Sequence, residues 1–583
     1  MQADHGPAEG PSGPGRRGWR AALGLACVVL GAVLATRPFT SLSVLVALVG
    51  AAAILTGATL GWAARRTGHR LDDLVAVGWV ALGLAVLAWP DLSVRGVALV
   101  TGAGMVAAGP LAVARGWRGT LDERLASVLH GAAGVVLGLL ALSWPDVTLL
   151  VVAVAFGART VLFGLSELWA AVRGTSRAER RPGRPRRWVH LAGATGALVG
   201  AVLLAGASAV LRAGEPVVDG FYDAPGEVPA EPGALLRAER FTREVPEGAV
   251  AWRILYTTTR DEGVPALASA LVVAPVGPAA DPRPVVAWAH GTTGIARTCA
   301  PSVLSDPFGS GAFFALDRVL DQGWVLVATD YVGLGTEGPH TYMVGQGEGR
   351  AVLDAVRAAH GLDELALDAA TVVWGHSQGG HAALWTGVLA AGYAPDVEVR
   401  GVAALAPASD LAGLVDGLRE MPGGSIFATY VVSAYAATYP EVRVEDYVRP
   451  AARVGFEATA GRCLGEPAVF ASIVGSLATG WSTFSGDVQA GPLADRLAQN
   501  VPTGDIDAPL LIGQGATDPL VRPEMQAAYV EARCARGQPV DYRTYPGRDH
   551  VGVVAADSPL IDELVTWTGD RLAGRPATDD CAR

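Results

Sequence analysis

The sequence predicts a chain of two parts: an all-α transmembrane domain of seven helices, followed by an α/β domain. Three observations lead to this prediction. Long apolar segments dominate the first 212 residues, whereas the later residues alternate short apolar runs with helical patterns. The chain has 583 residues, more than one hydrophobic core usually supports. The charge also divides, because residues 1–213 hold 20 Arg against 10 acidic residues and the remainder holds 25 Arg against 46.

Seven apolar segments in the first part are each about 17 to 25 residues long, enough for a helix to cross about 30 Å of hydrocarbon. Because further apolar segments follow the first one directly, we interpret it as a spanning helix and not as a cleaved signal peptide. Residues 1–17 are expected to be a disordered cytoplasmic N-terminus, and residues 18–172 a six-helix membrane domain. The segments are 19–36, 41–62, 73–89, 92–114, 125–144, 147–172 and 189–212.

The first six segments form an internal repeat of a helix, a tight Pro-containing turn and a second helix. The turns read ATRPFTSLSVL around Pro38, LAWPDLSVRGV around Pro90 and LSWPDVTLLVV around Pro145. Pro fixes one backbone torsion, and the Asp, Ser or Thr that follows can cap the next helix. We therefore predict three helical hairpins side by side, with the segment 189–212 as a seventh crossing. In these hairpins and turns, residues 18–172 resemble the HdeD-like short-repeat membrane proteins, a resemblance that implies no defined chemistry.

Arginines cluster in the loops between the hairpins, whereas the Pro turns carry almost none. The clusters lie at 15–20, 65–70, 115–124 and in the Arg-rich loop 173–188. The positive-inside rule places all four in the cytoplasm. The seventh helix then leads outward, so everything after Arg212 is expected to be extracytoplasmic.

Three ionisable residues fall inside the predicted spans: His130, Arg159 and Glu167. A charge within lipid is costly and often marks a functional site. A contact between His130 and Glu167 that only locks two helices together is the simpler interpretation.

The second part begins with a linker at 213–233 that is rich in Pro, Gly and acidic residues, and strands alternate with helical patterns over 234–583. A leading hairpin, VAWRILYTTT and ALASALVVAPV, precedes five short apolar runs. Buried strands alternating with helices predict an open parallel sheet with helices on both faces and ligands at the carboxyl ends of its strands. The five runs are PVVAWAHG, WVLVATDYVG, TVVWGHS, VRGVAALAPA and APLLIGQG.

Ser377 lies in TVVWGHSQGGH, which matches G-x-S-x-G between an apolar strand and the helix-like HAALWTGVL. In this context the glycines let the strand turn sharply and expose the hydroxyl as a nucleophile. A base must remove the hydroxyl proton, and a third group must orient the base. In the chain order Ser, acid, His, Asp518 follows the run APLLIGQG and His550 follows the next strand.

Both assignments have rivals. Asp505 and Asp507 precede their strand, Asp541 lies within a strand and Asp549 adjoins the His itself, so Asp518 is the preferred acid. His381 is the other His after Ser377, and on the helix of the Ser turn it is expected to be structural.

A tetrahedral intermediate needs hydrogen-bond donors already in place for its oxyanion. The turn HGTTG at 290–294 follows the strand VVAWA at a suitable position. We therefore predict the amides of Thr292 and Gln378 as the pair, with a simple tight turn as the alternative interpretation of HGTTG.

Four motifs in order, HGTTGIARTCAPS, ATDYVGLGTEGPHTY, GHSQGGH and GATDPLV, resemble the secretory lipase family, which includes the Candida lipase A type. The similarity runs from about residue 240 to the end. It implies an α/β-hydrolase fold, hydrolysis of triacylglycerol or other carboxylic esters, and Ser377, Asp518 and His550 at the catalytic positions. It also implies a cap, for which 410–503 is the available insertion. Asp330 is a family feature that we interpret as structural.

Five Cys are too few for a disulfide scaffold, and no CxxC metal spacing occurs. Cys27 lies in an apolar segment. The other four lie in the second part, where they are free to pair if that part is extracytoplasmic, or are otherwise four unrelated buried thiols. The resemblance to secretory lipases implies the pairs Cys299–Cys463 and Cys534–Cys581.

Together these features predict a multi-pass plasma-membrane protein whose extracytoplasmic serine hydrolase cleaves carboxylic esters of lipids through an acyl-enzyme. The expected partners are the bilayer and a lipid or lipophilic ester; no cofactor or metal is expected, and the acidic second part argues against nucleic acid. An acyltransferase or peptidase with the same triad is an alternative, as is a membrane sensor whose hydrolase domain only binds ligands. The sequence leaves the oligomeric state open.

Overall fold

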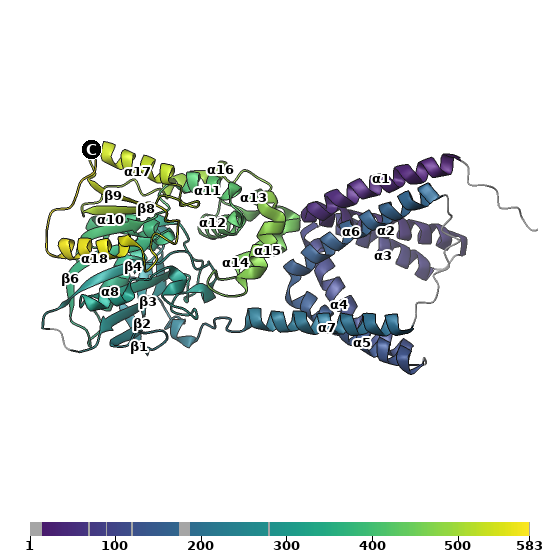
Figure 1. Ribbon diagram of the computed structural model, residues 1–583, viewed down its shortest axis with the longest axis horizontal. Coiled ribbons are helices and arrows are strands. Elements are labelled where there is room, and N and C mark those ends of the chain that lie inside the picture. The colour runs from purple at the N-terminus through teal and green to yellow at the C-terminus, as the bar shows by residue number, and fades with distance from the viewer. Residues whose placement is uncertain are drawn as a thin grey trace, which may run out of the picture. The chain divides into compact units, whose positions relative to one another are not determined.

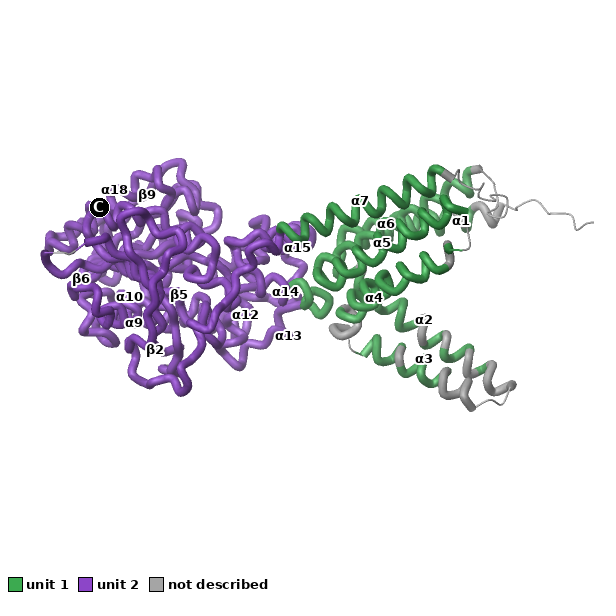
Figure 2. The backbone as a smooth tube through the Cα atoms, turned by 90° about the horizontal axis from the view of Figure 1, so that it is seen from below, with its two compact units in different colours: residues 1–210, 449–455 green, residues 211–448, 456–583 purple. Residues whose placement is uncertain are grey.

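The computed structural model describes residues 14–67, 70–88, 90–117, 120–173, 187–277 and 280–581. The chain divides into two compact units (Figure 2): unit 1 holds residues 1–210 with 449–455, and unit 2 holds 211–448 with 456–583. The predictions for residues 1–13 and 174–186, in the N-terminus and the Arg-rich loop, lie outside the described residues.

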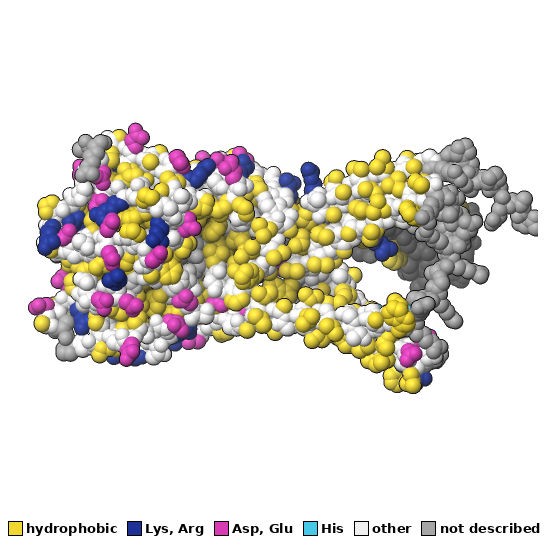
Figure 3. Space-filling model, in the orientation of Figure 1, with side chains coloured by type: hydrophobic (Ala, Val, Ile, Leu, Met, Phe, Trp, Pro, Cys, Tyr) yellow, Lys and Arg dark blue, Asp and Glu magenta, His cyan; other side chains and the backbone are white. Residues whose placement is uncertain are grey.

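The described part of unit 1 contains seven helices, one at each predicted apolar segment (Figure 1), and apolar side chains dominate the visible surface over them (Figure 3). Within the described residues, four helices are long and apolar enough to cross a membrane, or up to five spans if the bent pair α1 and α2 counts as one. The helices are α1 (Pro14–Thr36), α2 (Pro38–Thr67), α3 (Arg70–Ala88), α4 (Pro90–Gly116), α5 (Leu121–Ser143), α6 (Pro145–Arg173) and α7 (Arg187–Arg212).

The helices pair differently from the prediction. The tight pairs are α2 with α3, α4 with α5, and α1 with α6. The helices on either side of Pro38 diverge, with a bend of 115° between the apolar stretches of α1 and α2. Glycines explain the tight pairs, because a Cβ on Gly31 would stand 2.6 Å from the Val161 amide nitrogen and one on Gly109 would stand 2.6 Å from the Gly131 carbonyl oxygen. The prediction that each Pro turn closes a packed hairpin is therefore wrong.

Each of the three prolines is the first residue of a helix, α2, α4 or α6. The missing N–H of Pro costs nothing there, because the first amides of a helix have no acceptor within it. Asp146 consequently lies in the first turn of α6, one residue after Pro145. Its negative charge still favours that end of the helix dipole.

The three ionisable residues of the apolar segments have different surroundings. His130 Nδ1 lies 3.2 Å from the Ala126 carbonyl oxygen on its own helix. Glu167 is buried, whereas Arg159 is exposed. The contact of His130 with Glu167 stays a prediction.

Unit 2 is built on one mixed sheet of nine strands in the order β1-β2-β3-β5-β4-β6-β7-β8-β9. The predicted hairpin forms β2 and β3, the five apolar runs form β4 to β8, and these five strands with β9 are parallel. The sheet is mixed, because the predicted hairpin is antiparallel, β1 pairs antiparallel with β2, and β3 joins the parallel strands by an antiparallel pairing with β5. The strands are β1 (Leu235–Phe241), β2 (Ala249–Thr259), β3 (Pro265–Pro275), β4 (Arg283–Ala289), β5 (Val325–Val332), β6 (Leu367–His376), β7 (Glu398–Leu405), β8 (Leu510–Gly515) and β9 (Val540–Tyr545).

Helices cover both faces of this sheet, as predicted. Helices α9, α10 and α17 pack against one face, and α8 and α18 against the other, so each face has its own apolar core. The strands β5 and β8 are buried along their whole length. The helices are α8 (Leu316–Asp321), α9 (Gly345–Ala359), α10 (Gln378–Tyr393), α17 (Pro523–Ala535) and α18 (Pro559–Leu572), with 3-10 turns η2 (Gly220–Tyr222), η3 (Asp261–Gly263), η4 (Arg297–Cys299) and η5 (Gly309–Gly311).

The chain between β7 and β8 is a helical insertion that includes residues 410–503, for which a cap is predicted, and we call it the cap. It contains six α-helices and two 3-10 turns. They are α11 (Leu411–Glu420), α12 (Gly424–Thr438), α13 (Val444–Tyr447), η6 (Pro450–Ala452), α14 (Arg453–Ala460), α15 (Val469–Thr479), η7 (Gly480–Thr483) and α16 (Gly491–Gln499).

The predicted linker at 213–233 is partly docked on unit 2. Phe221 and Tyr222 are buried, and the Arg253 guanidinium lies 4.2 Å from the centre of the Phe221 ring. Asp219 accepts a hydrogen bond of 2.9 Å from Arg253, and the Tyr222 hydroxyl lies 2.8 Å from Ser302 Oγ. Residues 219–223 are therefore part of the α/β unit and not a free tether.

Candidate active site

Ser377 stands at the sharp turn between β6 and α10, in a backbone conformation that an L-residue rarely adopts. Its φ is 58° and its ψ is −116°. The flanking glycines are sterically required, because a Cβ on Gly375 would collide with the Gly379 carbonyl and one on Gly379 would collide with the Ala289 carbonyl. The Ser377 amide is held by the Leu405 carbonyl oxygen at 2.9 Å. The predicted strand, turn and helix around Ser377 are thus present.

The three predicted catalytic side chains lie in one hydrogen-bonded chain. The Ser377 hydroxyl lies 2.8 Å from His550 Nε2, and His550 Nδ1 donates to Asp518 Oδ2 at 2.7 Å. This arrangement leaves Nε2 as the acceptor of the hydroxyl proton, the tautomer that a general base needs. The three side chains come from the carboxyl ends of β6, β8 and β9.

Asp518 is buried and held by three further donors. Its Oδ1 accepts from the amides of Leu520 at 2.8 Å and Val521 at 2.9 Å, and its Oδ2 accepts from Gln514 Nε2 at 3.2 Å. Hydrogen bonds of this kind fix the direction of the carboxylate. The tight turn after β8 therefore presents one carboxylate oxygen to His550.

The rival acids have other partners or lie in solvent. Both oxygens of Asp541 bind the Arg543 guanidinium, at 2.9 and 2.8 Å. Asp549 Oδ1 accepts from the Gly552 amide at 2.7 Å. Asp505 and Asp507 are exposed. Among these acids, the structure brings Asp518 to His550.

The predicted oxyanion turn at 290–294 follows β4, next to the start of α10. Gln378 is the first residue of α10, so its amide has no acceptor within the helix and lies at the positive end of the helix dipole. Thr292 Oγ1 lies 3.0 Å from the Tyr342 hydroxyl, and the Tyr331 hydroxyl donates to the His290 carbonyl oxygen at 3.1 Å. Burial lowers the pKa of His290 to about 4, so its ring is neutral.

Sequence reasoning missed a buried polar network behind Gln378. The Gln378 side-chain amide donates to Glu348 Oε1 at 2.6 Å and to His340 Nε2 at 3.2 Å. Burial raises the pKa of Glu348 and lowers the pKa of His340 to about 3. His381 Nδ1 lies 3.2 Å from Glu348 Oε2, and its Nε2 donates to the Asn500 carbonyl oxygen at 2.7 Å. Both ring nitrogens of His381 are thus engaged in the core, as a structural role requires.

A second missed residue is His376, the variable residue that precedes Ser377 in the motif. Its Nε2 donates to the backbone carbonyl oxygen of His550 at 2.8 Å. The only signal in the sequence was a polar side chain at the end of a strand that is otherwise apolar.

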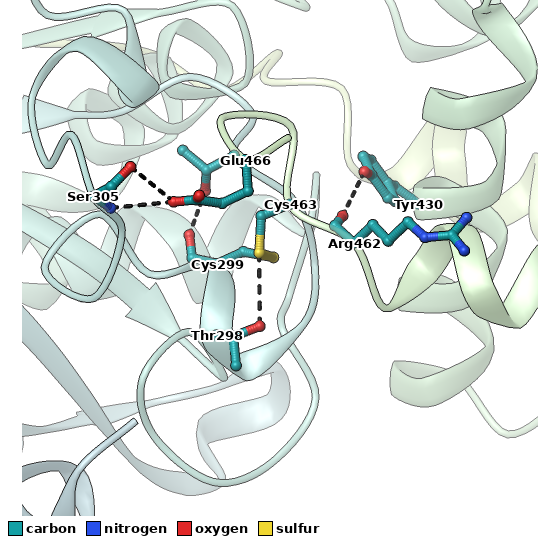
Figure 4. The surroundings of a disulfide bond; sticks show 8 residues. Thr298, Cys299, Ser305, Tyr430, Arg462, Cys463 and Glu466 are labelled. Atoms are coloured by element: carbon teal, nitrogen blue, oxygen red, sulfur yellow. Dashed lines mark hydrogen bonds between the residues drawn. A yellow bond between two sulfur atoms is a disulfide. The ribbon is translucent and has the colours of Figure 1, made fainter. Parts of the chain in front are cut away.

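The structure contains the disulfides Cys299–Cys463 and Cys534–Cys581, with Cα atoms 5.1 and 5.2 Å apart. Figure 4 shows the first, which joins the loop after the oxyanion turn to the cap segment between α14 and α15. Cys27 is a free cysteine.

Asp330 is buried next to this loop, where it accepts hydrogen bonds from the hydroxyls of Ser269 and Ser302, both at 2.5 Å. Burial raises the pKa of Asp330. These contacts join β3 and the loop to the end of β5, which agrees with a structural role. Within the described residues, no three His, Cys, Asp or Glu side chains are grouped so as to hold a metal ion.

Comparisons with known proteins find lipases among the similar sequences and structures. Lipase A of Arthroderma benhamiae is 26% identical over 63% of this chain and 81% of its own length, and a probable inactive lipase of Mycobacterium tuberculosis is 28% identical over 63% and 85%. The crystal structure of Candida antarctica lipase A covers 63% of this chain and 88% of its own, at 21% identity and a TM-score of 0.53, and so has the same fold. Residues 22–73 and 129–205 match a family described as a short repeat of unknown function, and residues 312–580 match the secretory lipase family. The C-terminal region of this chain is therefore similar to the secretory lipase family, and this similarity supports a carboxylic ester hydrolase.

Proposed function

We propose that this protein is a membrane-anchored serine hydrolase that cleaves carboxylic esters of lipids. The observation that carries the proposal is the hydrogen-bonded chain from Ser377 through His550 to Asp518, at the carboxyl ends of parallel strands. One relative is described as a probable inactive lipase, so the hydrogen-bonded chain supports the proposal in a way that similarity alone does not.

In the proposed reaction, Ser377 Oγ attacks the ester carbonyl carbon while its proton passes to His550 Nε2. Asp518 stabilises the imidazolium that forms. The oxyanion lies between the amides of Thr292 and Gln378, and each such donor is worth about 10² to 10³ in kcat. His550 then protonates the leaving alcohol, and a water molecule activated by His550 releases the acid from Ser377.

The surface of the cap supports a lipid substrate. Three large apolar side chains of α15 are exposed, Phe470 at 60%, Val474 at 55% and Leu477 at 64%. Their spacing of four and three residues places them on one face of the helix, and α15 contains no charged residue. An exposed apolar face without charge suits a lipid surface better than water.

The proposed location is the plasma membrane, which the chain crosses seven times, with unit 2 on the extracytoplasmic side. The four Arg-rich stretches support this orientation through the positive-inside rule. The two disulfides of unit 2 support it independently, because disulfides persist in oxidising compartments.

The test uses the full chain in membranes, with Ser377→Ala as the matched control. We expect hydrolysis of p-nitrophenyl butyrate and longer esters, together with covalent labelling of Ser377 by a fluorophosphonate, and neither in the variant. Ester turnover that survives the substitution would refute the mechanism. If the wild-type protein neither hydrolyses the esters nor reacts with the fluorophosphonate, it is a ligand-binding module. Faster cleavage of a peptide, or acyl transfer to an added alcohol in place of water, would replace hydrolysis of lipid esters as the activity.

The orientation has its own test. A protease added outside intact cells should digest unit 2 and spare the apolar helices. Digestion that occurs only after the cells are opened would place unit 2 in the cytoplasm.

A further inference from the structure

A short segment of the cap, residues 462–466, lies directly on the predicted oxyanion turn; we call it the strap. It runs between α14 and α15 and holds Cys463, which is bonded to Cys299 (Figure 4). The Leu464 amide donates to the Thr293 carbonyl oxygen at 2.8 Å, and Thr293 Oγ1 donates to the Cys299 carbonyl oxygen at 2.8 Å. The strap is therefore joined to the turn itself by a backbone hydrogen bond, and to the loop that follows the turn by a covalent bond.

The far end of the strap is fixed to the body of unit 2. Glu466 Oε1 accepts from the Ser305 amide at 3.1 Å and from its hydroxyl at 3.0 Å (Figure 4). Glu466 is buried, so losing these two donors would leave a carboxylate unsatisfied in a low dielectric. The strap therefore cannot shift at this end without cost.

Its near end is held from the cap helix α12. The Tyr430 hydroxyl donates to the Arg462 carbonyl oxygen at 2.9 Å. The Tyr430 ring packs edge-on against Tyr342, with ring centres 6.1 Å apart, and the Tyr342 hydroxyl lies 3.0 Å from Thr292 Oγ1. The cap thus reaches the oxyanion turn twice, through Leu464 at Thr293 and through Tyr342 at Thr292.

No space separates the strap from the turn. Gly294 has a φ of 130°, and a Cβ there would stand 2.6 Å from Cys299 Sγ and 3.2 Å from the Arg462 carbonyl oxygen. Close packing of this kind transmits a displacement of the strap to the turn, because neither side can yield into a void.

We propose that the strap is a positioning element for the oxyanion hole: the cap, through the Cys299–Cys463 disulfide and the Leu464 amide, sets the direction of the Thr292 amide. This inference rests on the proposed esterase function and adds a part of the cap to its machinery. The physical reason is that an oxyanion donor acts only when it is preorganised, and a misplacement of about 1 Å can cost about 10²-fold in rate.

The experiment compares two disulfide deletions in the full chain. Cys299→Ser/Cys463→Ser frees the strap, whereas Cys534→Ser/Cys581→Ser removes the bond between α17 and the C-terminal residues and is the matched control. For the strap variant we expect kcat on p-nitrophenyl butyrate, per fluorophosphonate-reactive Ser377, to fall about tenfold or more at nearly constant KM. The control should keep its kcat even where its Tm falls. Equal kcat in the two variants, or a loss confined to KM, would overturn the proposal.

A milder pair covers the case in which the strap variant does not fold. Tyr430→Phe deletes the hydroxyl that holds Arg462, and Tyr529→Phe deletes a buried hydroxyl that donates to the Pro502 carbonyl oxygen away from the turn. We expect a lower kcat per labelled Ser377 for Tyr430→Phe alone. The same kcat in the two single variants contradicts the role of the strap.

Amide hydrogen exchange tests the role of the strap independently of the proposed esterase function. Amides of residues 290–299 should exchange faster in the strap variant, or in Tyr430→Phe, than in its control, whether or not the protein hydrolyses esters. Unchanged exchange there refutes the strap. Absence of esterase activity in the wild-type chain, with the exchange difference present, refutes the proposed function and leaves the positioning contact established.

Discussion

His376 donates a hydrogen bond from Nε2 to the backbone carbonyl oxygen of His550, 2.8 Å away, and the two rings lie with their centres 4.8 Å apart. Burial, with a smaller contribution from the neighbouring His550, lowers the pKa of His376 to about 3. Its ring is therefore neutral at physiological pH, with the proton on Nε2. The residue before the proposed nucleophile thus fixes the segment that carries the proposed base.

This contact predicts that His376 positions His550. His376→Phe keeps the bulk of a ring but removes the donor, so kcat should fall about tenfold while KM stays within about twofold. The measurement is steady-state hydrolysis of p-nitrophenyl butyrate, normalised to Ser377 labelling. His360→Phe, at an exposed site after α9, is the control. A His376→Phe enzyme with the kcat of the control would show that the contact does not matter.

A second prediction concerns the acid. Asp518→Asn keeps the shape of the side chain but removes its charge. The amide also allows the wrong tautomer of His550, so kcat should fall about 10³ to 10⁴-fold. Asp541→Asn is the matched control, because Asp541 is also buried but pairs with Arg543. It should lower the Tm and leave kcat unchanged. If Asp541→Asn lowers kcat and Asp518→Asn does not, then Asp541 is the acid.

A third prediction concerns acid stability. Burial lowers the pKa of His340 to about 3, whereas the unfolded chain binds this proton near pH 6.5. The unfolded state therefore holds more protons between these values, and stability is lost as the pH falls through that window. At pH 5 the loss is about 2 kcal/mol for such a residue.

The test of this prediction is His340→Gln. Its free energy of unfolding, measured by thermal melting of the full chain, should fall less between pH 7 and pH 5 than that of the wild type. Parallel pH curves for His340→Gln and the wild type would mean that His340 is not a neutral buried ring.

A fourth prediction concerns the exposed face of α15. Leu477→Asp places a charge on this face, so the rate on long-chain esters in lipid vesicles should fall about tenfold. The rate on soluble p-nitrophenyl butyrate should not change, because the catalytic groups are untouched. Val264→Asp, at another exposed apolar residue next to β3, is the control. If the two variants lose the same fraction of the hydrolysis rate on vesicles, the exposed face of α15 does not bind lipid.

Much of the fold could be predicted from local patterns in the sequence. The apolar runs became β2 to β8 because strands that are buried on both faces need continuous apolar side chains, whether their pairing is parallel or antiparallel. The turn at Ser377 was readable because flanking glycines are the only residues that fit it. Strand β1 was missed, since LLRAERF mixes apolar and charged side chains, is only partly buried and lies at the edge of the sheet, paired with β2 alone.

The pairing of the apolar helices was not readable from the Pro repeat. A Pro turn indicates only where one helix ends and the next begins. Which helix it packs against depends on the glycines that meet across the interface, such as Gly109 and Gly131.

The sequence by itself determined the order of elements, the strand ends that carry Ser377, Asp518 and His550, and the division into an apolar and an acidic part, because each depends on a few neighbouring residues. Only the tertiary structure decided what surrounds them. Glu348 lies 30 residues from the Gln378 side chain that it binds, and Cys463 lies 164 residues from Cys299. Such contacts depend on the path of the whole chain, and no local pattern of residue types encodes them.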